Sequence, residues 1–199
     1  LMRSFVAKLK ETIIMKYFLI VLLLLVSTAS WCVYHKINEF SDADGMNSLS
    51  DMTVVDEKAY LTRNLTDVRG LQIVDVSDLD NPILLGSIGS YNELSSPTSV
   101  FVSNNIAYVT DWYDGLNLVD VSDPYHPVIL CLDAGNSLTD VTVVGDLAFI
   151  TDYYFGLSIY NVSNPQEMSY VGSFAISGNA MSVAVSGSYA YVAAGAGGL

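Results

Sequence analysis

The sequence predicts an all-β protein, a β-propeller built of four-stranded antiparallel blades. Two landmarks recur in one register along the 199 residues, and the last two intervals of each series are 41 and 42 residues. The Ala-aromatic-aliphatic landmark begins at Ala59, Ala107, Ala148 and Ala190, and the Gly-Leu landmark begins at Gly70, Gly115, Gly156 and Gly198. A period in the forties indicates a repeat architecture, and short apolar runs bounded by turn residues indicate strands. Together they favour a propeller blade of about 42 residues.

Four strands are expected in each repeat, taken in chain order. The first is rich in Val and covers 52–55, 100–102, 141–144 and 183–185. A tight turn such as Asn104-Asn105 leads to the second, at 59–61, 107–109, 148–150 and 190–192. The third covers 71–76, 116–121 and 157–162 and ends in Ser-Asp or Ser-Asn, which favours a turn. The fourth covers 83–85, 128–130 and 170–172, so residues 51–199 hold three full blades and half of a fourth.

The third strands resemble a known family. Residues 70–77 read GLQIVDVS and residues 115–122 read GLNLVDVS, which is similar to the LVIVD-repeat family of predicted propellers. Residues 108–111 are more weakly similar to YVTN-type surface propellers. The resemblance covers residues 51–199 and implies a propeller fold and an exported or surface location, with little assigned biochemistry. The third repeat has Tyr160-Asn161 where the others have Val-Asp, which indicates that the Asp is not essential to the strand.

Residues 1–34 are interpreted as an apolar leader helix for export, followed by a linker over 35–50. Residues 17–34 contain no charge and directly follow Lys16. Read from Met15, the segment ends in small residues up to Ala29, as a cleavable signal does. Read from Met2, it is an uncleaved anchor with Trp31 at the far interface. Both versions predict a secreted, periplasmic or cell-surface protein that contacts a membrane only through this leader.

The half blade at the end leads to a further expectation. Propellers close with four to eight blades. We therefore expect the natural protein to continue past Leu199.

The charges exclude some partners. The net charge is −13, all eight Lys and Arg precede residue 70, and 13 of the 21 acidic residues follow it. A stretch of 130 residues without a cation cannot neutralise phosphates, which argues against nucleic acid and anionic lipid as partners.

Catalytic and metal-binding residues are scarce. His126 is the only histidine beyond residue 70, and no Lys or Arg accompanies it, so no catalytic constellation and no cofactor are expected. Calcium has no supporting motif, although clustered carboxylates could hold it; the alternative is that these aspartates form turns. The candidate calcium ligands are Asp75, Asp78 and Asp80, or Asp111, Asp114 and Asp152.

The loop between the second and third strands is the candidate binding site. In two successive repeats it places aromatic rings beside carboxylates, which suits a sugar or a peptide. The alternative is that the rings pack between blades. The candidate residues are Asp111, Trp112, Tyr113, Asp114, Asp152, Tyr153 and Tyr154, with Phe155 beside them. A second set in register, at the start of the first strands near the channel, is Asp51, Ser99, Asp140 and Ser182.

The sequence therefore predicts an exported, non-catalytic propeller that recognises a protein or a carbohydrate. The alternative is an exported propeller enzyme, a hydrolase or lyase that uses Asp and Tyr, either with Ca²⁺ or without it.

Overall fold

The computed structural model describes residues 49–64, 69–133 and 135–198. The leader predicted over 1–34 and most of the linker lie outside these ranges. Within them, no helix has the length and apolar character needed to cross a bilayer.

The described residues form fourteen strands and one short 3₁₀ helix. The first sheet contains β1 (Leu49–Val55), β2 (Lys58–Asn64), β3 (Arg69–Asp75) and β4 (Ile83–Ile88). The second contains β5 (Pro97–Ser103), β6 (Ile106–Asp111), β7 (Gly115–Asp120) and β8 (Val128–Asp133). The third contains β9 (Leu138–Val144), β10 (Leu147–Asp152), β11 (Gly156–Asn161) and β12 (Ser169–Phe174). The fourth pairs β13 (Ser182–Ser186) with β14 (Tyr189–Ala193), and η1 (Gly195–Gly197) follows.

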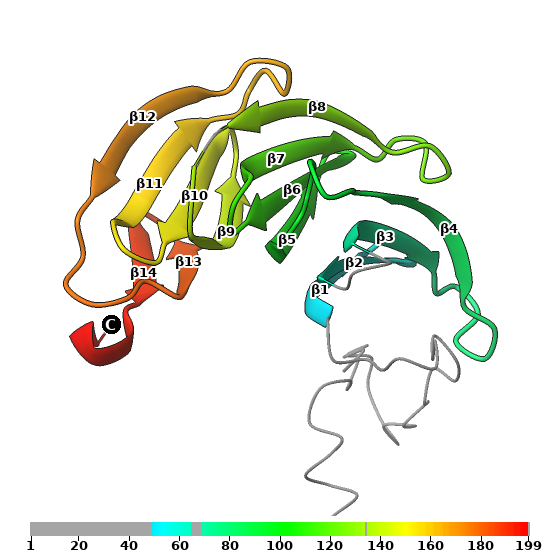
Figure 1. Cartoon of the computed structure of the whole chain (residues 1–199), viewed down its shortest axis with the longest axis horizontal. Helices are drawn as coiled ribbons and strands as arrows, with labels where there is room; N and C mark the ends of the chain where they lie inside the picture. Colours follow the sequence, from blue (N-terminus) through cyan, green and yellow to red (C-terminus); the bar gives the residue numbers. More distant parts are fainter. Residues whose placement is uncertain (1–48, 65–68, 134, 199) are drawn as a thin grey trace, which may run out of the picture.

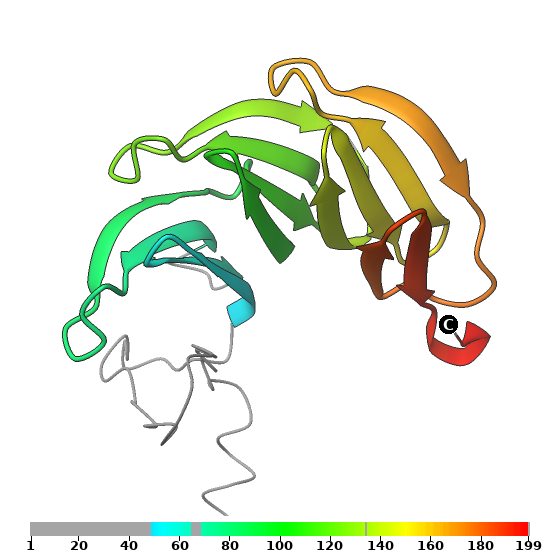
Figure 2. The ribbon, with the colours of Figure 1, turned by 180° about the vertical axis from the view of Figure 1, so that it is seen from behind.

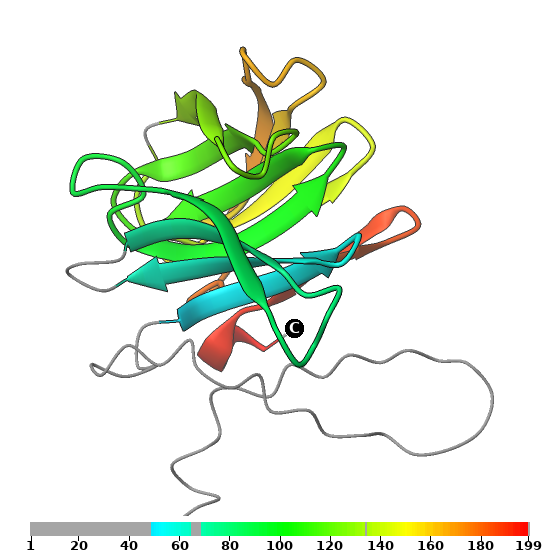
Figure 3. The same ribbon diagram turned by 90° about the vertical axis from the view of Figure 1, so that its right-hand side faces the viewer.

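Each sheet is an antiparallel meander in chain order, which confirms the prediction of four strands per repeat. The first strands β1, β5, β9 and β13 contact one another along the inside of an arc, and β4, β8 and β12 form its outer rim (Figures 1 and 2). The arc is not closed. Seen from the side, the successive sheets pack face to face (Figure 3). The fold is therefore propeller-like.

Both faces of the second sheet are apolar, and each packs on a neighbouring sheet. Strand β6 shows the alternation: Ala107 and Val109 belong to the cluster shared with the first sheet. Ile106 and Tyr108 belong to the cluster shared with the third sheet. Ala107, Val109 and Tyr108 are at most 5% exposed. Burying one large apolar side chain contributes about 1.5–3 kcal/mol, so these junctions supply most of the stabilisation.

A line of polar side chains joins the inner strands. The Ser99 hydroxyl oxygen lies 2.7 Å from Asp51 Oδ2 and 2.9 Å from Asp140 Oδ1. The Ser182 hydroxyl donates to Asp140 Oδ2 at 2.7 Å. The two carboxylates also accept backbone N–H groups from the neighbouring sheet, from Val100 and Val183. The set predicted in register at the start of the first strands is thus one hydrogen-bonded row across four sheets.

The inner strands β1, β5 and β9 begin earlier than the sequence predicts, and each of the three contains a register shift near its start. The register of β5 against β6 shifts at Thr98, and that of β9 against β10 shifts at Thr139. The bulged hydroxyls reach the next sheet: Thr98 donates to the Leu138 carbonyl at 2.8 Å, and Thr139 to the Ala180 carbonyl at 2.9 Å. These two bulges therefore add a polar bond to the junctions between the second and third sheets and between the third and fourth.

The residue that ends the third strand forms an Asx turn in every complete repeat. Its Oδ1 accepts the N–H of the serine two residues on, at 2.8, 2.9 and 2.9 Å for Asp75, Asp120 and Asn161. An amide oxygen accepts this bond as a carboxylate does, which explains why the third repeat can have Asn161.

The glycine of the Gly-Leu landmark is required by the backbone. Gly70, Gly115 and Gly156 have φ of 99°, 73° and 103°, a region that side chains disfavour. A Cβ on Gly156 would also lie 2.5 Å from the Phe174 carbonyl oxygen in β12. The landmark glycine is thus required by the backbone conformation with which the chain enters the third strand.

We expect Gly156→Ala to lower the free energy of unfolding by about 1–3 kcal/mol, the usual range for backbone strain. The matched control is Gly172→Ala in β12, because a Cβ there meets no atom within 4 Å. Urea unfolding followed by circular dichroism measures both. Equal midpoints for the two variants would contradict this role of Gly156.

Candidate functional site

The two predicted aromatic loops lie side by side. They connect β6 to β7 and β10 to β11, at the same end of adjacent sheets. Ser137 joins their backbones: its N–H donates to the Trp112 carbonyl at 2.7 Å, and its carbonyl accepts the Tyr153 N–H at 2.9 Å. The loops therefore hold a fixed position relative to each other.

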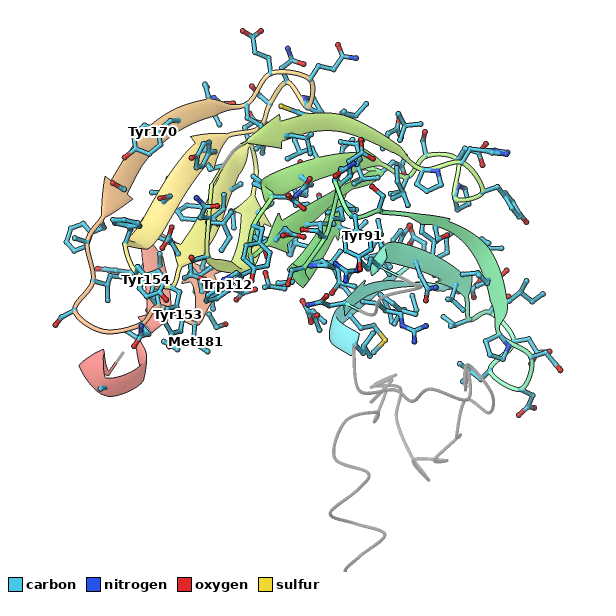
Figure 4. All side chains as sticks on the ribbon, in the orientation of Figure 1. Tyr91, Trp112, Tyr153, Tyr154, Tyr170 and Met181 are labelled. Atoms are coloured by element: carbon cyan, nitrogen blue, oxygen red, sulfur yellow. The ribbon has the colours of Figure 1, made fainter. Side chains whose placement is uncertain are left out.

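Three rings from these loops form one cluster. The Trp112 and Tyr153 ring centroids are 5.5 Å apart across the junction between the second and third sheets. Tyr154 lies edge-on to both, with its centroid 6.5 Å from Trp112 and 4.9 Å from Tyr153. Figure 4 shows the three rings grouped where the loops meet, with Met181 beside them. We call Trp112, Tyr153 and Tyr154 the aromatic cluster.

The cluster combines a packed part with an exposed part. Trp112 and Tyr153 are half-buried, whereas Tyr154 is 63% exposed. In the same two loops, Tyr113 is 67% exposed and Phe155 is 76% exposed. Packing between blades is the alternative to ligand binding that the sequence offers. Trp112 and Tyr153 pack in this way, and the other rings face solvent.

The Asp111 carboxylate turns away from solvent. It is fully buried, and it accepts the N–H groups of Ser96 at 2.7 Å, Tyr113 at 2.8 Å and Asp114 at 3.0 Å. Burial raises the pKa of this carboxyl, against the lowering effect of these three donors. Asp111 thus fixes the backbone of the β6–β7 loop through these hydrogen bonds.

Asp152 and Asp114 have similar roles. Asp152 is 8% exposed, and its Oδ1 accepts the N–H groups of Tyr154 at 2.8 Å and Phe155 at 3.0 Å. Asp114 Oδ2 accepts the Ser95 N–H at 2.8 Å. The structure therefore brings the predicted carboxylates and rings into the same loops. Oxygens of Asp111, Asp114 and Asp152, however, accept backbone N–H groups. What remains for a ligand is a mainly aromatic surface.

The candidate calcium ligands of the first sheet also form turns. Asp78 Oδ1 accepts the Asp80 N–H at 3.0 Å, and Asp78 Oδ2 accepts the Asn81 amide at 3.0 Å. In the part of the chain that the structure describes, no three acidic, His or Cys side chains converge as metal ligands.

Three residues that the sequence analysis did not single out lie at this end of the sheets. The Arg69 guanidinium stacks on the Tyr91 ring, 4.0 Å from its centroid, and its Nη1 donates to the Ser95 carbonyl at 3.1 Å. Met181 is 50% exposed beside the aromatic cluster. The repeat register could have identified Arg69 as a loop residue, because it directly precedes the landmark glycine Gly70, just as Asp114 of the candidate site directly precedes Gly115. Tyr91 lies in a connection without a landmark.

Family comparison agrees with the repeat seen in the sheets. The model of the LVIVD repeat matches residues 66–90, 96–131, 135–176 and 177–199, together more than half of the chain. The chain belongs to the LVIVD repeat family. One matched LVIVD repeat, 135–176, contains the whole of the third sheet from β9 to β12. No curated protein matches the chain.

Solved structures share the fold of these LVIVD repeats at low sequence identity. A functionally unknown protein from Desulfotomaculum acetoxidans DSM 771 has a TM-score of 0.62 at 17% identity, over 75% of this chain and 50% of that one. The computationally designed Ika4 protein has a TM-score of 0.59 at 9% identity, over 78% of this chain and 91% of Ika4. The LVIVD chain thus spans half the length of the Desulfotomaculum protein. These likenesses concern the fold alone.

We expect Asp111→Asn to destabilise the protein by about 1–3 kcal/mol, the cost of leaving a buried N–H without an acceptor. Both Asp111 oxygens accept N–H groups, and an amide nitrogen cannot replace either. Asp152→Asn is the control, because Oδ1 alone accepts both of its loop donors, so an amide preserves them. Thermal melting compares the two. An equal loss in both variants would contradict the loop-holding role of Asp111.

Proposed function

We propose that this chain is part of an exported, non-catalytic β-propeller that recognises a protein or a carbohydrate at the cell surface or in the periplasm. The sheets are its blades, and the loops at the β6–β7 end form its recognition face. The proposal rests on one observation above all, the solvent-facing rings around the aromatic cluster. Tyr113, Tyr154 and Phe155 are each more than 60% exposed, and a group of exposed rings is typical of interaction sites.

The rigidity of the loops supports recognition. Asp111 and Asp152 each accept two N–H groups within their own loop, and Ser137 ties the two loops together. A surface that is ordered before binding loses less conformational entropy when a ligand arrives. The rings are thus preorganised.

The alternative of an exported enzyme has less support. The Asp111 and Asp152 carboxylates, which such an enzyme would use beside the tyrosines, are hydrogen-bonded to backbone N–H groups. His126 Nδ1 lies 2.9 Å from Asp123 Oδ2 in a turn where both side chains are more than half exposed, so water solvates this pair. We therefore propose a module that works without catalysis and without a cofactor.

The recognition role predicts a specific loss of binding. Labelled full-length protein is applied to arrays of oligosaccharides and of peptides, and Tyr154→Ala is compared with the parent. We expect signals to fall about tenfold or more, as for an interface hot spot. The melting temperature should change little, because Tyr154 is 63% exposed.

The control for this experiment is Tyr125→Ala. Tyr125 is 61% exposed in the β7–β8 turn, at the opposite end of the sheet. The Tyr125→Ala variant should give the same array signals as the parent. Array signals that respond equally to both substitutions, or to neither, would exclude the proposed face.

Export is tested separately. The chain is produced in bacteria with a C-terminal tag, and protease is added to intact spheroplasts. We expect the tag to be degraded in the parent and protected in a Leu22→Asp, Leu24→Asp variant, because charges in the apolar run prevent export. A tag that is protected in both would contradict an exported location.

A further inference from the structure

We propose that the ligand of this face is an extended cationic peptide, a segment of a partner protein whose arginine or lysine side chain packs on the exposed rings around the aromatic cluster. This inference rests on the proposed function, and it names the chemistry of the partner. It depends on three observations.

The first observation is that the chain makes this contact within itself in the first sheet. The Arg69 guanidinium stacks on the Tyr91 ring at 4.0 Å, at the end of the sheet where the loops lie. In the second and third sheets the residues at the register position of Arg69 are Asp114 and Phe155. No Lys or Arg therefore occupies this register position in the second and third sheets.

The second observation is the charge around the rings. The sequence from residue 70 onward contains no Lys or Arg. The carboxylates of Asp111 and Asp152 lie inside the loops that present the rings, bonded to the N–H groups of Tyr113 and Tyr154. The face of an aromatic ring attracts cations, and the 13 acidic residues that follow residue 70, with no Lys or Arg among them, add a general attraction for a cationic ligand. An acidic partner would be repelled.

The third observation is that the surface is long and offers few acceptors beside the rings. Tyr91, Trp112, Tyr154 and Met181 come from successive repeats, and Figure 4 shows them distributed along the arc. Both Asp111 oxygens and Asp114 Oδ2, which would orient the hydroxyls of a sugar, accept backbone N–H groups instead. Extended side chains with a charged tip fit such a row of rings better than a compact polar ligand does.

Fluorescence of Trp112 provides the test. The full chain carries Trp31→Phe, so that Trp112 is its only tryptophan. Hexa-arginine amide is the probe, and hexa-citrulline amide is its neutral counterpart with the same shape. We expect saturable quenching by hexa-arginine, with citrulline at least about tenfold weaker, because only the arginine peptide makes the cation–π contacts.

The control variants separate the rings from the overall charge. Tyr154→Ala and Tyr113→Ala leave the net charge unchanged and remove exposed rings, so we expect hexa-arginine to bind at least about tenfold more weakly. Tyr125→Ala should bind as the parent does. If both ring variants bind hexa-arginine with parental affinity, or if citrulline binds equally well, the inference is wrong.

The same variants distinguish the two proposals. Loss of a neutral ligand from the arrays in Tyr154→Ala, together with no binding of hexa-arginine by the parent, would overturn the cationic partner and preserve the recognition face. Parental binding of every array ligand by Tyr154→Ala, together with parental binding of hexa-arginine by both ring variants, would overturn both.

Discussion

The structure depends on one constraint: a sheet with two apolar faces must be covered on both. In the second sheet, alternate residues of β6 pack on the first sheet and on the third. This packing sets the order of the sheets along the arc, but apolar contacts alone do not fix how far one sheet slides along the next. The inner strands provide that register through directional bonds, in which Ser99 contacts carboxylates of both neighbouring sheets and Thr98 reaches the Leu138 carbonyl.

The surface proposed as a recognition face is a consequence of the same register. Once the second and third sheets are aligned, the loops that follow β6 and β10 meet, and Ser137 bonds to Trp112 and Tyr153. Asp111 and Asp152 occupy equivalent positions and shape each loop from within. Exposed rings such as Tyr154 are therefore held by backbone geometry that the repeat already requires.

The sequence predicts the repeat, the four strands and the turns well, because strand and turn propensities act locally. It even anticipates that Asn161 can replace the aspartate, since the turn needs only an acceptor. It does not reveal that Asp111 faces inward, because the N–H donors that bind it come partly from Ser96, fifteen residues earlier. Nor does it reveal the inner bulges at Thr98 and Thr139, whose bonds are made to the following sheet. The Arg69–Tyr91 contact is missed because Tyr91 lies in the connection between β4 and β5, outside the strands and turns that the repeat pattern predicts.

Acidic residues at the two ends of the sheets differ in their burial. At the turn end, hydrogen bonds lower the pKa values of Asp75, Asp78, Asp120 and Asp123, so these exposed carboxylates remain charged at neutral pH. At the loop end, buried Asp111 is committed to the backbone. Neither group offers a free carboxylate pair beside the rings. The proposed cationic partner would be attracted by the ring faces and by the 13 acidic residues that follow residue 70 with no Lys or Arg among them, and its extended shape would match the exposed rings of successive repeats.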